Sequence, residues 1–136
     1  MSEMDLIYQW FERAKNDLIC AEHLFNDLYP KQIDISCYHC QQSAEKALKG
    51  YLEYKGIDIP RTHNLVLLCQ ICEDINESFS DLADNCSDLT PYSVQARYPN
   101  EIVITEEEAT TALKETKQIF NFTICLVSNL EQLLQN

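Results

Sequence analysis

The sequence predicts an all-α fold, an antiparallel up-and-down four-helix bundle with one additional short helix, in a single domain over residues 1–136. Apolar residues recur every three or four positions through long segments, which is the period of a helix with one buried face. Two glycines and four prolines in 136 residues leave these segments free to run without interruption. Residues 102–104 are the only β-like run, so no strand pattern competes.

The first helix is expected over residues 4–28, with Asp17 beside its apolar stripe as a possible buried partner for a basic or hydroxyl group. Pro30 ends this helix, because the residue before a proline is pushed out of the helical region. Asp34 is a suitable cap for a second helix that continues to residue 54 or 55. Gly56 can end that helix in the left-handed conformation.

A third helix is expected to start from Thr62 or Asn64 and to end near residue 75. A short helix around residues 79–86 follows, and then a turn of helix with an extended loop over residues 91–100. The last helix begins with a capping box at residues 105–108 and is expected to reach about residue 134. It is apolar over more than one arc, which predicts self-association and a homodimer.

The composition limits the classes of partner. The 22 acidic and 10 basic residues give a net charge of −12, which opposes general adhesion to nucleic acid or anionic lipid and makes RNA a possible but disfavoured ligand. No run of 18 apolar residues and no charged-then-apolar leader occurs, so we expect neither a membrane span nor a signal peptide. The expected location is the cytoplasm.

Seven cysteines are present, an odd number without a secretory leader, which implies no disulfide framework. Two Cys-x-x-Cys pairs, Cys37/Cys40 and Cys69/Cys72, superficially suggest a four-thiolate zinc site. Both pairs lie inside helical patterns and on the apolar arc, where cysteine acts as a small hydrophobic residue. We therefore expect core packing, with neither a metal nor a cofactor.

The second helix has two contrasting faces. Its apolar arc consists of Cys37, Cys40, Ala44, Ala47, Leu48 and Tyr51. Its opposite face carries a polar row of His39, Gln42, Lys46, Lys49 and Glu53. This row offers donors, acceptors and positive charge in one line, so it is either a solvated helix face or part of a binding site.

Two further candidates for an anion site lie outside that helix. His63 lies at the N-terminus of the third helix, where backbone amides favour an anion, although it can equally serve as a capping or loop-anchoring residue. Arg97 and Tyr98 precede a proline and can clamp a phosphate while the ring stacks on a base. The alternative for Arg97 is a structural salt bridge, to Asp17 or Glu45. We predict one anion site in which Arg97 and Tyr98 fold back on the polar row, with His63 at its rim.

Four segments together resemble the HEPN domain family, the higher eukaryotes and prokaryotes nucleotide-binding domain. Residues 37–49, Cys-Tyr-His-Cys-Gln-Gln-Ser-Ala-Glu-Lys-Ala-Leu-Lys, resemble its "FHxQQAAEKALKA" helix. Residues 62–65 are similar to its "THDL" motif, residues 92–99 to "YxxxRYP", and residues 10–18 to its "WLxxAxxDL" start. The matches come in order and cover essentially the whole chain. The resemblance implies a helical bundle with a fifth short helix that commonly dimerises.

The resemblance also implies a function. Many members of the family pair with a minimal nucleotidyltransferase in two-gene toxin–antitoxin systems, and some are metal-independent ribonucleases that act through an Arg-x(4–6)-His motif near the final helix. This sequence departs from that motif, because Arg13 precedes His23 by ten residues, Arg61 precedes His63 by two, and no histidine follows Arg97. Without the paired donor and general base we expect a non-catalytic, nucleotide-binding module with a nucleotidyltransferase partner. The alternatives are a ribonuclease toxin with a rearranged site drawn from His39, His63 and Arg97, or a helical scaffold without a ligand.

Overall fold

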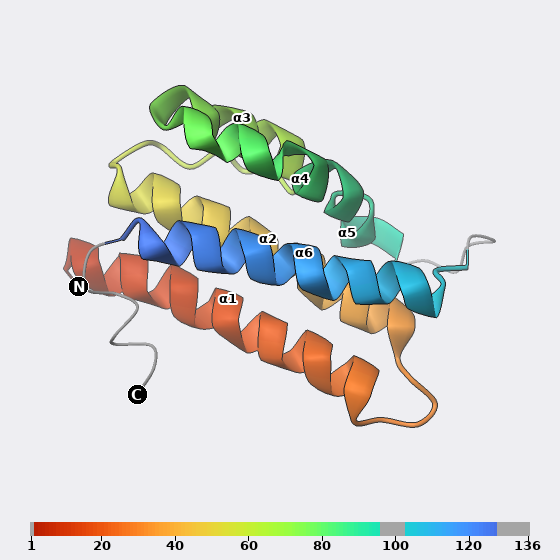
Figure 1. Ribbon diagram of the computed structural model, residues 1–136. Helices are drawn as coiled ribbons and strands as arrows, with labels where there is room; N and C mark the ends of the chain where they lie inside the picture. Colours follow the sequence, from red (N-terminus) through yellow and green to blue (C-terminus); the bar gives the residue numbers. More distant parts are fainter. Residues whose placement is uncertain (1, 96–102, 128–136) are drawn as a thin grey trace.

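Three long helices form the body of the molecule, as a computed structural model shows for residues 2–95 and 103–127. They are α1 (Glu3–Asn26), α2 (Ile33–Tyr54) and α6 (Glu106–Cys125). The shorter elements are α3 (Leu65–Ile75), the 3₁₀ helix η1 (Glu77–Leu82), α4 (Ala83–Leu89) and α5 (Tyr92–Gln95). Figure 1 shows α1 on one side of α2 and α6, and the α3–α5 segment along the other side. No strand occurs in the described residues, so the all-α prediction is confirmed.

The long helices begin and end mostly where local signals place them. Ser2 caps α1 through a capping box with Asp5. The predicted capping box of α6 is present, with mutual 3.0 Å hydrogen bonds between Thr105 and Glu108. Gly56 has a φ of +69°, as predicted for the residue that ends α2. Local sequence signals therefore define most helix boundaries.

Two predicted boundaries are wrong. Asp34 does not cap α2, which begins at Ile33, two residues earlier than such a cap implies, with Gln32 as its cap and no side-chain bond. The backbone N–H of Gln32 donates to the carbonyl of Leu24 at 3.0 Å, so the connection from α1 fixes where α2 starts. The last helix ends at Cys125 and not near residue 134, because the N–H groups of Leu126 and Val127 bond to carbonyls three residues back and close the final turn.

The middle of the chain follows the prediction more closely. Asn64 caps α3 by accepting hydrogen bonds from the N–H groups of Val66 and Leu67, and the helix ends at Ile75 as expected. The short helix expected near residues 79–86 is longer and consists of η1 followed by α4. The predicted helical turn after Pro91 is α5, whereas the extended loop expected after it lies mostly outside the described residues.

The core lies between the apolar arc of α2 and its neighbours. All six predicted arc residues are at most 1% exposed. A Cβ atom at Gly50 would lie 2.6 Å from Cε2 of Phe11 and 3.0 Å from Cβ of Trp10, so glycine allows α1 to approach α2 closely. Hydroxyl groups reinforce this approach, because Ser36 donates to the carbonyl of Ala21 at 2.8 Å and Ser43 to that of Ala14 at 2.7 Å. These contacts fix the antiparallel register of α1 and α2.

The cysteine pairs belong to this core. Cys37, Cys40 and Cys72 are fully buried, Cys69 is 3% exposed, and all seven cysteines are free thiols. Burial raises the pKa of Cys37, Cys40 and Cys72 to about 12, so these thiols are protonated at neutral pH. Across the described ranges, no three residues of the types His, Cys, Asp and Glu are grouped so as to hold a metal ion.

The basis of the dimer prediction does not hold for the described part of α6. Most of its large apolar side chains are buried, with Ile124 only 4% exposed, and the half-buried Phe122 and Leu126 pack against the core cluster. The arc that seemed to face away from the core is covered because α1, α2 and α4 all contact α6. The homodimer therefore stays a prediction. None of the described helices is long and apolar enough to cross a membrane.

Candidate functional site

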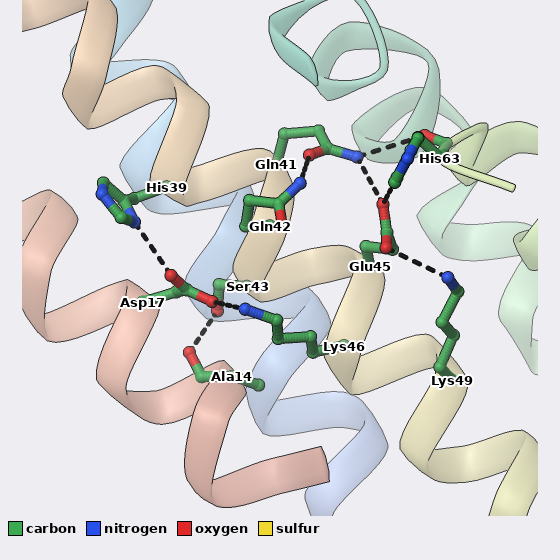
Figure 2. A network of polar contacts seen from close by, with 10 residues as sticks. All are labelled: Ala14, Asp17, His39, Gln41, Gln42, Ser43, Glu45, Lys46, Lys49 and His63. Atoms are coloured by element: carbon green, nitrogen blue, oxygen red, sulfur yellow. Dashed lines mark hydrogen bonds and ion pairs between the residues drawn. The ribbon is translucent and has the colours of Figure 1, made fainter.

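Four residues of the polar row of α2, His39, Gln42, Lys46 and Lys49, are divided between two clusters, each built around one carboxylate (Figure 2). The first, the Asp17 cluster, joins α1 to α2. Oδ1 of Asp17 lies 2.8 Å from Nδ1 of His39, and Oδ2 accepts a hydrogen bond from Nζ of Lys46. The side chain of Asp17 is 12% exposed, while those of His39 and Lys46 are 27% and 25% exposed. The prediction that Asp17 finds a basic partner is confirmed.

The second, the Glu45 cluster, joins α2 to the segment before α3. Its carboxylate lies 2.8 Å from Nδ1 of His63, accepts from Nζ of Lys49 at 3.0 Å and accepts from Nε2 of Gln41 at 3.1 Å. The same amide of Gln41 donates to the backbone carbonyl of His63 at 3.1 Å, and Nε2 of Gln42 donates to Oε1 of Gln41 at 2.6 Å. Two contacts from His63 thus hold the chain before α3 against α2.

The charge state of Glu45 follows from these contacts. Burial alone would raise the pKa of this carboxyl group, but hydrogen bonds from His63, Gln41 and Lys49, together with the charge of Lys49, hold the pKa below its ordinary value. Glu45 is therefore ionised at neutral pH. Its charge compensates that of Lys49, which is itself only 8% exposed.

Each cluster leaves one nitrogen of an imidazole ring for other contacts. A carboxylate only accepts hydrogen bonds, so Nδ1 of His39 and Nδ1 of His63 carry the proton that they share with Asp17 and Glu45. Nε2 is then a lone-pair acceptor in the neutral ring and a donor in the protonated ring. The side chain of His63 is 59% exposed, more than twice the value for His39. The arrangement can therefore present N–H donors to an anion or accept a proton from a hydroxyl group.

The structure brings the predicted site residues together in two groups and not one. His39 and Lys46 meet at Asp17, whereas Lys49 and His63 meet at Glu45. The row is not a solvated face of free charges, because both lysines are paired. For His63, the loop-anchoring alternative is confirmed, and a role in anion binding stays a prediction.

Sequence reasoning missed two members of the Glu45 cluster. Gln41 is fully buried, yet it holds together Glu45, His63 and Gln42. Glu45 entered the prediction only as a partner for Arg97, although its four-residue spacing from Lys49 is an ion-pair signal on a helix. A buried glutamine within a run of polar residues gives no such signal.

Arg97 and Tyr98 lie outside the described residues, so their predicted position against the polar row stays a prediction. Asp17 and Glu45, the two carboxylates considered as partners for Arg97, already hold His39 with Lys46 and His63 with Lys49. A salt bridge from Arg97 would therefore have to share one of these carboxylates.

Comparisons with known proteins identify a family. A family model described as the HEPN domain matches residues 7–128. The fold is similar to the crystal structure of ST0689, an archaeal HEPN homologue, with 24% identity, a TM-score of 0.71 and coverage of 90% of this chain and 98% of that chain. It is also similar to the crystal structure of TT1696 from Thermus thermophilus, with 27% identity, a TM-score of 0.70 and coverage of 86% of this chain and 94% of that chain. No curated protein sequence matches the chain.

Proposed function

The chain belongs to the HEPN domain family, and on that premise we propose that it is a non-catalytic, nucleotide-binding module that works with a minimal nucleotidyltransferase in a toxin–antitoxin-type pair. Membership of this family supports the proposal of a nucleotidyltransferase partner. The observation that supports the ligand is the Asp17 cluster, where an imidazole and an ammonium group contact the two oxygens of one carboxylate on a partly exposed face.

The cluster suits a phosphate because its ammonium group and its imidazole ring are held in place. Asp17 orients His39 and Lys46 at once, so a bound anion does not bear the full entropy cost of ordering two flexible side chains. Lys46 alone balances the charge of Asp17, and a protonated His39 adds one positive charge to the site. A charge-assisted hydrogen bond to phosphate contributes about 1.5–3 kcal/mol.

Calorimetric titration with nucleotides and with ribose 5-phosphate tests the ligand. Lys46→Ala should weaken binding about tenfold to a hundredfold, since it removes one charge-assisted contact. Lys114→Ala is a matched control, because Lys114 is exposed on α6 and forms no ion pair with another described residue. Equal affinities of the two variants and the wild type would refute the phosphate contact.

Arg97→Ala tests the predicted contribution of the segment outside the described residues. If Arg97 contacts the nucleotide, affinity should fall about tenfold to a hundredfold without a change in melting temperature. A lowered melting temperature with unchanged affinity would assign Arg97 to a structural salt bridge instead.

The assembly has two separate tests. Co-expression with a minimal nucleotidyltransferase from the same genome should yield a complex that co-elutes at constant stoichiometry, and separate elution would refute the partner. Light scattering at micromolar concentration should give twice the 15.8 kDa chain mass. A monomer mass would refute the homodimer.

One observation favours a second candidate function, a metal-independent ribonuclease with a rearranged site. Both His39 and His63 have Nδ1 bound to a carboxylate, which is the arrangement that makes Nε2 an effective general base. RNA cleavage in the presence of EDTA that is lost in His39→Gln or His63→Gln would establish this activity. Intact RNA with wild-type protein would refute this candidate function.

A further inference from the structure

A small pocket opens beside the Asp17 cluster, between the first turns of α1 and the end of α2. It has a volume of about 210 Å³ and is lined by Leu6, Gln9, Trp10, Arg13 and Glu53. The lining combines an indole ring and an aliphatic side chain with a cation and an anion. Arg13 and Glu53 form no ion pair with each other or with another described residue, so both charged groups are available to a ligand.

Helix geometry places this pocket and the Asp17 cluster along the same α1–α2 seam. On α1, positions 6, 10, 13 and 17 are three or four residues apart and therefore share one face. On α2, positions 46 and 53 are two turns apart on one face. Contacts between Ser43 and Ala14 and between Gly50 and Trp10 fix the antiparallel register. Asp17 and Trp10 are then about 10 Å apart along the helix axis, a span that a ribose can bridge between a phosphate and a base.

The pocket fits a planar base better than a whole nucleotide. Pockets that enclose an entire small-molecule ligand usually measure about 300–1,000 Å³, so 210 Å³ suits a base ring with the sugar and phosphate outside. Trp10 supplies a stacking surface, which binds the face of any base. Gly50 keeps the indole close to α2, because a Cβ atom there would lie 3.0 Å from Cβ of Trp10.

The two charged groups select among the bases. Guanine presents O6 and N7 as adjacent acceptors, which a guanidinium group binds with two parallel hydrogen bonds, as Arg13 can. Its other edge presents N1–H and the N2 amino group as adjacent donors, which match the two oxygens of the Glu53 carboxylate. Adenine places the lone pair of N1 where guanine has a donor, and a carboxylate repels it.

We propose that the pocket lined by Trp10, Arg13 and Glu53 binds the guanine base of a nucleotide whose phosphate contacts Lys46 and His39. The phosphate half of this proposal rests on the proposed function, whereas the base half does not. The site thus has a base pocket at one end of the seam and an anion-binding surface at the other.

Fluorescence provides a direct measurement, because Trp10 is the only tryptophan of the chain. Titration with GMP should quench its emission, and AMP should bind at least about tenfold more weakly. Guanosine should also quench, with lower affinity, since it lacks the phosphate. Ribose 5-phosphate should bind by calorimetry without quenching.

Two variants and a control separate the base-binding half of the proposal from the phosphate-binding half. Glu53→Gln should bring GMP and AMP to similar affinities and leave ribose 5-phosphate unaffected, while Lys46→Ala should weaken GMP and ribose 5-phosphate but not guanosine. Lys114→Ala, exposed on α6 and outside the lining of the pocket, should change nothing, and unchanged melting temperatures verify folding. No response to guanosine or GMP, or equal binding of GMP and AMP by wild type, would overturn the base pocket. Quenching by guanosine with no gain from the phosphate would instead refute the proposed function and leave the base pocket standing.

Discussion

Glu45→Gln should destabilise the protein strongly although it changes a single atom of the side chain. The Glu45 carboxylate and the Lys49 ammonium group are 3.0 Å apart, with side chains only 7% and 10% exposed. Removal of one partner leaves the other charge buried without compensation, which costs about 3–5 kcal/mol for a fully buried pair. Lys49 can extend its flexible stem toward solvent, so we expect a loss of about 2–4 kcal/mol in the free energy of unfolding at pH 7.

Urea denaturation followed by circular dichroism measures this loss. Glutamine keeps the shape of the residue and can accept hydrogen bonds, so the loss reports the charge and not a cavity. With a typical denaturant slope, the midpoint should fall by roughly 1–2 M urea.

Wild-type stability should itself decline as the pH falls below the ordinary range of a carboxyl group, because the pKa of Glu45 is lower in the folded protein than in the unfolded chain.

A double-mutant cycle distinguishes a buried pair from a general loss of packing. Lys49→Met alone should also destabilise the fold, since it leaves Glu45 without its ammonium partner. The double variant should be more stable than the sum of the two single losses predicts, by at least about 1 kcal/mol. Additive losses, or a Glu45→Gln variant within about 0.5 kcal/mol of wild type, would refute the electrostatic reasoning.

Three smaller predictions concern stability. Burial, together with the hydrogen bond and charge of Asp88, raises the pKa of Glu115 from 4.5 to about 8, so wild-type stability falls as the pH rises between these values. Glu115→Gln should remove this decline, so the free energy of unfolding of the variant relative to that of wild type should be about 1–3 kcal/mol higher at pH 8 than at pH 5. The same difference from wild type at both pH values would contradict the raised pKa of Glu115. Gly50→Ala should lower the free energy of unfolding by about 1–2 kcal/mol and with it the melting temperature, because the clash of a Cβ atom 2.6 Å from the buried Phe11 ring outweighs the gain in helix propensity. An unchanged melting temperature would show that the ring moves aside. Asn64→Ala should cost about 1 kcal/mol in chemical denaturation, since it removes the acceptor for two N–H groups at the start of α3, and no loss would mean that water replaces the cap.

The class of the fold and most helix ends can be predicted from the amino-acid sequence alone. The reason is that helices depend on interactions within four residues, so apolar spacing, the Thr105 capping box and the left-handed Gly56 can all be identified locally. The apolar arc of α2 also identified Cys37 and Cys40 as buried, because one face of a helix has a fixed period. Motif resemblance further identified the family that the domain match confirms.

The contacts that the side chains of the polar row make depend instead on the packing of the helices. Asp17 lies 22 residues from His39 and 29 from Lys46, while Glu45 lies 18 residues from His63, and no local pattern encodes such distances. On one helix, His39, Lys46 and Lys49 appear as a single row of charge. Because α1 supplies Asp17 on one side of α2 and the segment before α3 supplies His63 to Glu45 on the other, the row is divided into two clusters. The same register places the pocket lined by Trp10 on the same seam as Lys46. That register depends on Gly50 and Ser43, whose small size lets the two helix backbones approach closely.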